Sequence, residues 1–346
     1  MNGWRKGLAA LVTLLAVALI SGCTLPQPPG AAPLRYRDPV FTNVTVTSNL
    51  QYGTAPDAQG TPVPLRLDMY RPTGDTQTSR PALVWVHGGS FSGGDKTNVV
   101  PVDVANTFAK LGYVVVSINY RLLGSSCVAN PSGCAVAAIE AKRDAQAAVR
   151  WLRANAATYR IDPTRIGIGG ESAGAITATL VGLFSEDVGS SGNPSWPSTV
   201  GGFVSVSGGL PSGGLASAGD APGLFFHGSA DNTVPASWSV NTAIEMLNAG
   251  VPAWLQIQDG AGHVPWAQYR TLYLEQADWF FYLNLDLAHA AGQPPAAAKA
   301  SQEQLRKLGA SQQAERLLRK HPKLKRVRSA RGSWPARAEV RLRPGA

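Results

Sequence analysis

Length and composition predict one large folded unit flanked by two different ends. The chain has 346 residues, of which 44% are hydrophobic and 15% are charged, which excludes a wholly disordered chain and one too short to bury a core. The net charge of +9 comes from the end of the chain, because residues 290–346 hold 14 of the 31 Lys and Arg but only 3 of the 22 Asp and Glu. The remaining residues are slightly acidic, so their charge does not indicate a nucleic-acid-binding domain.

Residues 1–22 are expected to be an export signal. Arg5 and Lys6 precede an apolar run at residues 7–20, which is short for a membrane span. The following tetrapeptide, which ends in Cys23, resembles the lipobox of bacterial lipoproteins. That resemblance implies cleavage before Cys23, acylation of this cysteine and a membrane anchor, and Thr24 in the next position favours the outer membrane or cell surface. The alternative is an ordinary signal peptide with an incidental cysteine.

Residues 23–35 are predicted to be the anchor and a Pro/Gly-rich spacer, and residues 36–289 a single domain. Two alternating runs, at residues 44–52 and 63–70, predict an antiparallel edge. Further runs are apolar without alternation, as is typical of strands covered on both faces: residues 82–86, 114–118, 166–169, 203–206, 224–226 and 254–257. Helical patterns lie between them, at residues 102–111, 136–159, 173–184, 237–247 and 266–287. This alternation predicts an α/β fold with a mainly parallel sheet of about eight strands and helices on both faces.

The first buried strand ends in a glycine-rich loop, His87-Gly88-Gly89-Ser90. Such a loop can supply backbone N–H groups to an oxyanion hole, and Gly89 and Ser90 are the predicted donors. His87 is expected to orient the loop through a hydrogen bond rather than to transfer protons.

Two cysteines, Cys127 and Cys134, lie in one loop after the next strand. An exported chain is found where disulfides persist, so these thiols are predicted to pair. Their spacing is wrong for a zinc pair and no histidine lies nearby, so no metal site is predicted.

The pentapeptide Gly170-Glu171-Ser172-Ala173-Gly174 follows an apolar strand and opens into a helical pattern. A serine on a tight turn from strand to helix presents its hydroxyl above the sheet, and flanking glycines let neighbouring backbone approach. Ser172 is therefore the predicted nucleophile, and the N–H of Ala173 a third oxyanion donor.

Two later strands end in an acid and an imidazole, Asp231 and His263. The carboxyl ends of parallel strands share one edge of a sheet, so both should lie near Ser172. His263 is predicted to be the general base, with Asp231 fixing its tautomer. Asp259 is a weaker alternative for the acid because it precedes the histidine on the same loop, and His227 is expected to be a structural hydrogen-bonding residue.

The sequence does not assign a catalytic role to two other acidic residues, Asp144 and Glu171. Asp144 lies in a helical pattern beside Arg143 and Arg150, most simply as part of surface ion pairs. Glu171 is expected either to pair with a cation beneath the turn or to face solvent.

The substrate pocket is expected to be open. Only residues 185–200 separate the helix after Ser172 from the next strand, which is too short for a helical lid. Four aromatic residues could line the pocket, although core packing explains most of them equally well: Phe91, Trp196, Trp238 and Trp266.

Residues 290–346 are predicted to be a basic and largely disordered tail. It could contact anionic lipid, a cell-wall polymer or nucleic acid, or simply act as a solubilising extension. No specific nucleic-acid partner is predicted.

Several of these segments together resemble the α/β-hydrolase superfamily. Within it they resemble the secreted carboxylesterases, which include the feruloyl esterases and the acetyl esterases. The resemblance covers roughly residues 43–289. It implies an α/β-hydrolase fold with a minimal cap, no cofactor and an acyl-enzyme mechanism on short-chain or aromatic esters, including polymer-linked ones. By the same resemblance an acid is often found at the position of Asp144. The alternatives are a surface-anchored binding protein without activity and a serine peptidase, although the chain lacks the large propeller or cap usual in such peptidases.

Overall fold

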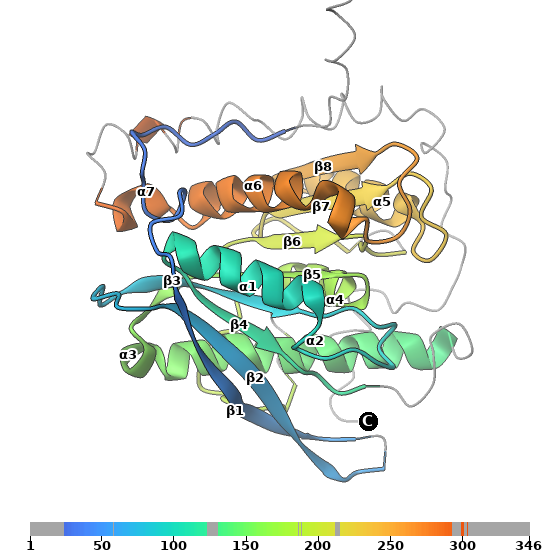
Figure 1. Ribbon diagram of the computed structural model, residues 1–346. Coiled ribbons are helices and arrows are strands. Elements are labelled where there is room, and N and C mark those ends of the chain that lie inside the picture. Colours follow the sequence, from blue (N-terminus) through green and yellow to red (C-terminus); the bar gives the residue numbers. More distant parts are fainter. Residues whose placement is uncertain are drawn as a thin grey trace, which may run out of the picture.

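The described residues form a single twisted sheet with helices on both faces (Figure 1). A computed structural model describes residues 24–57, 59–122, 131–185, 187, 189–211, 215–292, 299–300 and 303. Within these residues eight strands lie in the order β1-β2-β4-β3-β5-β6-β7-β8. They are β1 (Val44–Pro56), β2 (Pro62–Pro72), β3 (Arg80–Val86), β4 (Val114–Ile118), β5 (Ile161–Glu171), β6 (Phe203–Val206), β7 (Gly223–Gly228) and β8 (Ala253–Gln258).

Strand directions confirm the predicted sheet. β1 pairs antiparallel with β2, and β2 with β4, whereas the pairs from β4 through β3 to β8 are parallel. Every residue of β3, β4, β6 and β7 is buried, because helices cover both faces of the sheet at these strands. This explains why these strands read as continuous apolar runs. The edge strand β1 is mostly exposed or half-buried, and only Tyr52 and Ala55 are buried in it.

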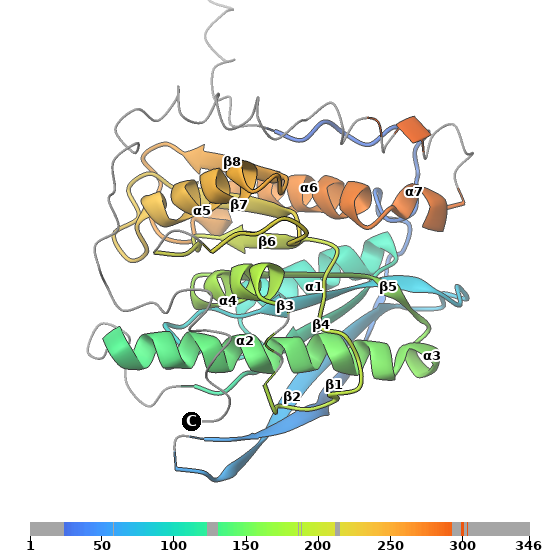
Figure 2. The same cartoon turned by 180° about the vertical axis from the view of Figure 1, so that it is seen from behind.

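Helices divide between the two faces of the sheet. They are α1 (Val99–Leu111), α2 (Pro131–Ala154), α3 (Ala156–Tyr159), α4 (Ala173–Leu183), α5 (Ala236–Asn248), α6 (Trp266–Asn284) and α7 (Leu287–Ala290). α1 and α6 cover the face seen in Figure 1, and α2, α4 and α5 cover the face seen in Figure 2. Successive residues of β3 alternate between two apolar clusters: Val84 packs with α2, α4 and α5, while Leu83 and Trp85 pack with α1 and α6.

One predicted helix differs from expectation. The pattern over residues 136–159 forms two helices, because Asn155 adopts φ −107° and ψ 17° between α2 and α3. Arg160 then takes a left-handed conformation with φ 56° and donates its backbone N–H to carbonyl groups of α3, which ends the short helix and leads into β5.

The segment expected to be a spacer lies against the domain. The backbone N–H of Leu25 donates to Oε1 of Gln276 on α6 at 2.6 Å, and Nε2 of Gln276 donates back to the Leu25 carbonyl at 3.3 Å. Leu25 and Leu34 are buried in the cluster on this face, and Arg37 donates to two carbonyl groups of the segment. The apolar residues at either end of the Pro/Gly-rich stretch therefore dock it beside α6.

Several predictions lie outside the described residues. These include the export signal at residues 1–22, Cys23, Cys127 and most of the tail at residues 290–346. Cys134 lies in α2, half-buried against the core, but the pairing with Cys127 stays a prediction. None of the helices in the described ranges is long and apolar enough to span a bilayer.

Candidate active site

Ser172, His263 and Asp231 form a hydrogen-bonded chain at the carboxyl edge of the sheet. Nε2 of His263 lies 2.9 Å from Oγ of Ser172, and its Nδ1 lies 2.7 Å from Oδ2 of Asp231. Ser172 lies between β5 and α4, whereas Asp231 and His263 follow β7 and β8. The structure thus brings together the three residues that the strand ends predicted.

The turn that carries Ser172 depends on close backbone packing. Ser172 adopts φ 55° and ψ −120°, and its N–H donates to the carbonyl of Val206 on the neighbouring strand. A Cβ atom on Gly174 would lie 1.9 Å from the Val86 carbonyl oxygen, and one on Gly170 would lie 2.5 Å from the backbone of Gly174. Both flanking glycines are therefore required for the turn to sit against β3.

The charge of Asp231 is stabilised locally. Burial by itself would raise the pKa of this carboxyl, but hydrogen bonds from His227, His263 and the N–H groups of Val234 and Thr233 outweigh it. They hold the pKa of Asp231 well below its usual range, so the side chain is ionised at neutral pH. Its side chain is fully buried, while that of His263 is 24% exposed, so solvent and ligands reach the imidazole but not the acid.

The structure also places His227 and Asp259, the two other residues considered for this site. His227 is buried, with Nδ1 2.7 Å from Oγ of Ser239 and Nε2 2.9 Å from the Val234 carbonyl, which fits the expected structural role. Asp259 accepts a hydrogen bond from Ser229 at 3.0 Å. Asp231, not Asp259, therefore contacts the imidazole of His263.

The glycine-rich loop after β3 lies directly beside Ser172. A Cβ atom on Gly88 would be 3.1 Å from Cβ of Ser172. The carbonyl of Gly89 accepts hydrogen bonds from the N–H groups of Ser92 and Gly93, and Gly89 and Ser90 have φ values of 126° and 55°. Ala173 begins α4, where N–H groups lack partners within the helix. The loop and the helix N-terminus thus flank the serine as the sequence predicted.

Glu171 differs from both expectations, because it neither pairs with a cation nor faces solvent. Its Oε2 accepts from Nε1 of Trp85 at 2.7 Å, and its Oε1 accepts from the N–H of Gly88 at 3.0 Å. Burial raises the pKa of Glu171 to about 8, and these two hydrogen bonds only partly offset it. The side chain beside the nucleophile therefore fastens the glycine-rich loop to the turn.

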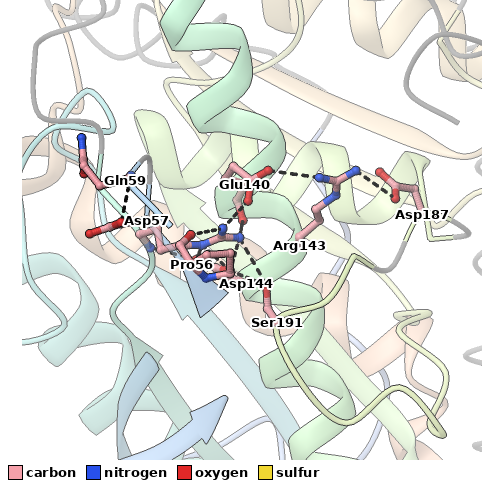
Figure 3. Close-up of polar contacts among 9 residues, drawn as sticks. Pro56, Asp57, Gln59, Glu140, Arg143, Asp144, Asp187 and Ser191 are labelled. Carbon is pink, nitrogen blue, oxygen red and sulfur yellow. Dashed lines mark hydrogen bonds and ion pairs between the residues drawn. The ribbon is translucent and has the colours of Figure 1, made fainter. Parts of the chain in front are cut away.

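Asp144 is not part of a surface ion pair. It is fully buried and accepts hydrogen bonds from the backbone N–H, Nε and Nη2 of Arg121, and from Oγ of Ser191 at 2.6 Å. Figure 3 shows Asp144 and Glu140 on successive turns of α2 with Ser191 nearby; Glu140 forms an ion pair with the same arginine. The sequence could not indicate this burial, since Arg121 lies on a distant segment.

Tyr120, the residue before Arg121, supports the glycine-rich loop. The hydroxyl of Tyr120 donates to the His87 carbonyl at 3.1 Å, and the two rings stack with centroids 4.5 Å apart. Nδ1 of His87 lies 2.7 Å from the Gly88 carbonyl, and burial lowers the pKa of His87 despite that contact. His87 is thus held as a neutral ring that supports the loop, in agreement with the expected orienting role.

Sequence reasoning missed Ser207. This buried serine follows β6 with φ 55°, and its Oγ accepts the N–H of Val264 at 3.0 Å. Because Val264 is next to His263, Ser207 fixes the loop that carries the imidazole. Its position directly after an apolar strand could have indicated it, because the same position indicates Asp231.

Most of the aromatic residues proposed for the pocket belong elsewhere. Phe91 and Trp266 are buried, and Trp266 donates to Asp103 at 2.9 Å. Trp196 is 43% exposed, but its loop joins the far end of α4 to the start of β6, away from Ser172. Among the described residues no cluster of three His, Cys, Asp or Glu could hold a metal ion.

Part of the chain is similar in sequence to known esterases. Residues 67–195 match the BD-FAE family. The chain is 34% identical over 122 residues to the fumonisin B1 esterase of Sphingopyxis macrogoltabida, which covers 34% of this chain and 22% of that protein. It is 35% identical over 109 residues to the carboxylesterase NlhH of Mycobacterium tuberculosis, which covers 32% of this chain and 31% of that protein. The chain thus spans less than a third of these relatives.

Solved structures match over a much longer stretch. A truncated carbohydrate esterase from gut microbiota superposes with a TM-score of 0.57 at 24% identity, covering 71% of this chain and 98% of that one. Esterase 2 of Thermogutta terrifontis superposes with a TM-score of 0.58 at 24% identity, covering 76% and 98%. The chain has the α/β-hydrolase fold. In the α/β-hydrolase fold a serine on a turn from strand to helix, with an acid and a histidine later in the chain, is the expected order of a catalytic triad.

Proposed function

We propose that this protein is a serine carboxylic-ester hydrolase that acts through an acyl-enzyme intermediate. The observation that carries the proposal is the unbroken hydrogen-bonded chain from Oγ of Ser172 through His263 to Asp231. A serine hydroxyl is a poor nucleophile at neutral pH, and an adjacent imidazole that can accept its proton removes this barrier.

The proposed reaction has two matching halves. Oγ of Ser172 attacks the acyl carbon of the ester while its proton moves to Nε2 of His263. The tetrahedral intermediate collapses, the alcohol leaves with the proton from Nε2, and the acyl group stays on Oγ. Water then attacks the acyl carbon, gives its proton to Nε2, and the acid leaves as the proton returns to Oγ.

Two charges develop during the proposed reaction, on the imidazole of His263 and on the oxyanion, and each has a proposed partner. The ionised Asp231 accepts from Nδ1 of His263 and stabilises the imidazolium that forms when Nε2 takes a proton. The N–H groups of Ala173, Gly89 and Ser90 are the proposed donors to the oxyanion. Loss of one donor of this kind typically costs about 3 kcal/mol of barrier stabilisation.

The proposed substrates are short-chain or aromatic esters, including polymer-linked ones. Two comparisons support a small acyl group: esterase 2 of Thermogutta terrifontis has been solved with butyrate and with propionate bound. The gut carbohydrate esterase supports an ester on a polymer or sugar. His263 remains partly exposed at the mouth of the site, which suits an alcohol portion that extends outward.

We also propose that the mature protein is held on a membrane by a lipid on Cys23. Support comes from the basic residues, apolar run and cysteine of the N-terminal segment. Leu25 is docked on α6, so an anchor two residues earlier would hold the domain close to the lipid surface. Incorporation of labelled palmitate should be lost in Cys23→Ala; persistent labelling would contradict the assignment.

Hydrolysis of p-nitrophenyl acetate tests the esterase proposal. Ser172→Ala should reduce kcat by about 10⁴-fold or more, with an unchanged circular dichroism spectrum as the control for folding. A fluorophosphonate should label the wild type but not the variant; the Thermogutta enzyme has been solved phosphorylated by paraoxon. A wild-type chain that neither turns over the ester nor reacts with the probe would instead indicate a surface-anchored binding protein.

A further inference from the structure

A polar cavity lies at the opposite end of the sheet from Ser172. Its volume is about 350 Å³, within the size range of small-molecule sites. β5 connects the two places: Arg160 precedes its first residue and Ser172 follows its last. With 11 residues in the strand, the cavity is roughly 30 Å from the serine. The end of β2, the start of β3 and the end of α3 line it, at the α3 edge of Figure 1.

The cavity is lined by three arginines and one aspartate, Arg71, Arg80, Arg160 and Asp75. Arg80 is buried and its guanidinium is fixed in place. Its Nη2 donates to the Tyr159 carbonyl at 2.8 Å and its Nε donates to the Arg160 carbonyl at 3.3 Å. Such fixed forks of N–H groups are well suited to planar or tetrahedral oxyanions.

The single carboxylate does not neutralise these arginines. Oδ2 of Asp75 forms ion pairs with Nη2 of Arg35, outside the cavity lining, and with Nη1 of Arg80 at 3.7 Å, so this one carboxylate is shared between two arginines. Burial lowers the pKa of Arg80, Asp75 opposes this, and the charges of Arg71, Arg35 and Arg160 lower it further. The charged residues that line the cavity are therefore three arginines and one shared aspartate, which leaves an excess of positive charge.

Arg71 lines the same cavity and is oriented by its neighbours. Nε of Arg71 is buried and has no hydrogen-bond partner, although its Nη2 donates to Oγ1 of Thr47 at 3.2 Å. Its guanidinium carbon lies 5.8 Å from the ring centre of Tyr159, which orients the group. A guanidinium that is already held in place loses little freedom when it binds an anion.

We propose that this cavity binds a phosphate-type oxyanion, either inorganic phosphate or the phosphate group of a lipid headgroup. Three guanidinium groups suit a dianion with several acceptor oxygens better than a single carboxylate, which would leave most of the charge unmatched. Thr45 and Thr158, which also line the cavity, add hydroxyl groups that can donate to the same oxygens. The site is independent of the ester hydrolysis proposed for Ser172.

Isothermal titration of the full chain with sodium phosphate, at constant ionic strength against sodium chloride, tests the proposal. Wild type should bind phosphate at one site. Arg71→Gln combined with Arg160→Gln should weaken binding by about tenfold or more, since charge-assisted donors are removed. If the double variant does not fold, Arg160→Gln alone serves, because this residue lies at an exposed position. Hydrolysis of p-nitrophenyl acetate should be unchanged in either variant.

Arg66→Gln is the matched control, because Arg66 is an exposed arginine on the same strand as Arg71 and lies outside the cavity lining. It should bind phosphate like the wild type. Equal weakening in Arg66→Gln and in the double variant would mean only non-specific attraction, and would overturn the site. Absence of phosphate binding by the wild type would overturn it as well.

Vesicles distinguish the two sources of the phosphate group. Phosphatidylcholine vesicles with and without phosphatidic acid should be compared for retention of wild type and double variant. Retention that requires phosphatidic acid, Arg71 and Arg160, and that inorganic phosphate competes away, assigns the site to a headgroup. Phosphate binding without such retention assigns it to the free ion. Either result supports the site.

Discussion

The charged side chains near the two ends of β5 are balanced differently. At the carboxyl end, Asp231 is surrounded by donors that match its charge, and only the imidazole of His263 is left partly open. At the other end, Arg71, Arg80 and Arg160 line a cavity around one aspartate that is already held by Arg35. A site of the kind proposed at Ser172, for neutral esters, can satisfy its own charges in advance, whereas the proposed anion site needs an excess of positive charge.

The difference extends to the backbone. Gly170 and Gly174 at the carboxyl end have no room for a Cβ atom, because the turn packs on β3. Gly74 lines the cavity with nothing within 4 Å of an added Cβ. The serine turn is therefore rigidly placed, and the cavity end retains space that a ligand can fill.

Replacing the aspartate at each end separates the two roles most strongly. Asp231→Asn should lower kcat for p-nitrophenyl acetate by roughly 10³- to 10⁴-fold, because the amide favours the wrong tautomer of His263. Asp75→Asn should leave kcat unchanged. Steady-state kinetics of both variants, with melting temperatures as the folding control, checks this. A small loss in Asp231→Asn would show that the acid is not essential to the triad.

The buried ion pair between Asp144 on α2 and Arg121 should matter for the stability of the domain. Asp144→Ala leaves Arg121 without its buried partner and should reduce the free energy of unfolding by about 3–5 kcal/mol. Glu140→Ala, one turn earlier on α2, should cost about 1 kcal/mol or less, since Asp144 still holds Arg121. Urea denaturation of the two variants gives both values. Equal losses would mean that Asp144 is an ordinary surface pair after all.

A pH dependence of stability is expected from Glu171. Its pKa is about 8 in the folded protein against an ordinary value of 4.5, so between these values the folded state holds a proton that the unfolded state has released. Its contribution to stability is therefore complete below pH 4.5 and lost as the pH rises to 8. A pKa difference of about 3.5 units corresponds to about 5 kcal/mol. Relative to Glu171→Gln, the melting temperature of the wild type should therefore fall by roughly 10 °C over this range.

The exposed carboxyl of Glu275 on α6 provides the control for that pH series. Glu275→Gln should give a melting curve parallel to that of the wild type across the same pH range. If Glu171→Gln is parallel to the wild type as well, the Glu171 carboxyl is ionised at neutral pH and the predicted proton is absent.

Strand positions and the triad could be predicted from the sequence for one physical reason. Strands buried on both faces appear as uninterrupted apolar runs, and the residues that follow them meet at one edge of a parallel sheet. Ser172, Asp231 and His263 were identified in this way. Ser207 follows the same rule, but a serine among glycines carries no separate chemical signal.

Burial of charged residues could not be predicted, because it depends on partners from distant segments. Asp144 is adjacent in sequence to Arg143, yet its partner is Arg121. Glu171 accepts from Trp85, 86 positions away. The arginine cavity is built from three separate elements, and no spacing between Arg71, Arg80 and Arg160 indicates that they meet. Likewise, docking of Leu25 depends on Gln276 at the other end of the domain.

The central claim is that His263 makes the hydroxyl of Ser172 attack an acyl carbon. Rapid acid quenching of the enzyme with p-nitrophenyl acetate, followed by peptide mass spectrometry, tests it most directly. The proposed mechanism predicts one acetyl group on the peptide that contains Ser172, formed in a burst with p-nitrophenol and absent in His263→Ala. Product release without acetylated Ser172, or acetylation that is equally fast in His263→Ala, would contradict it.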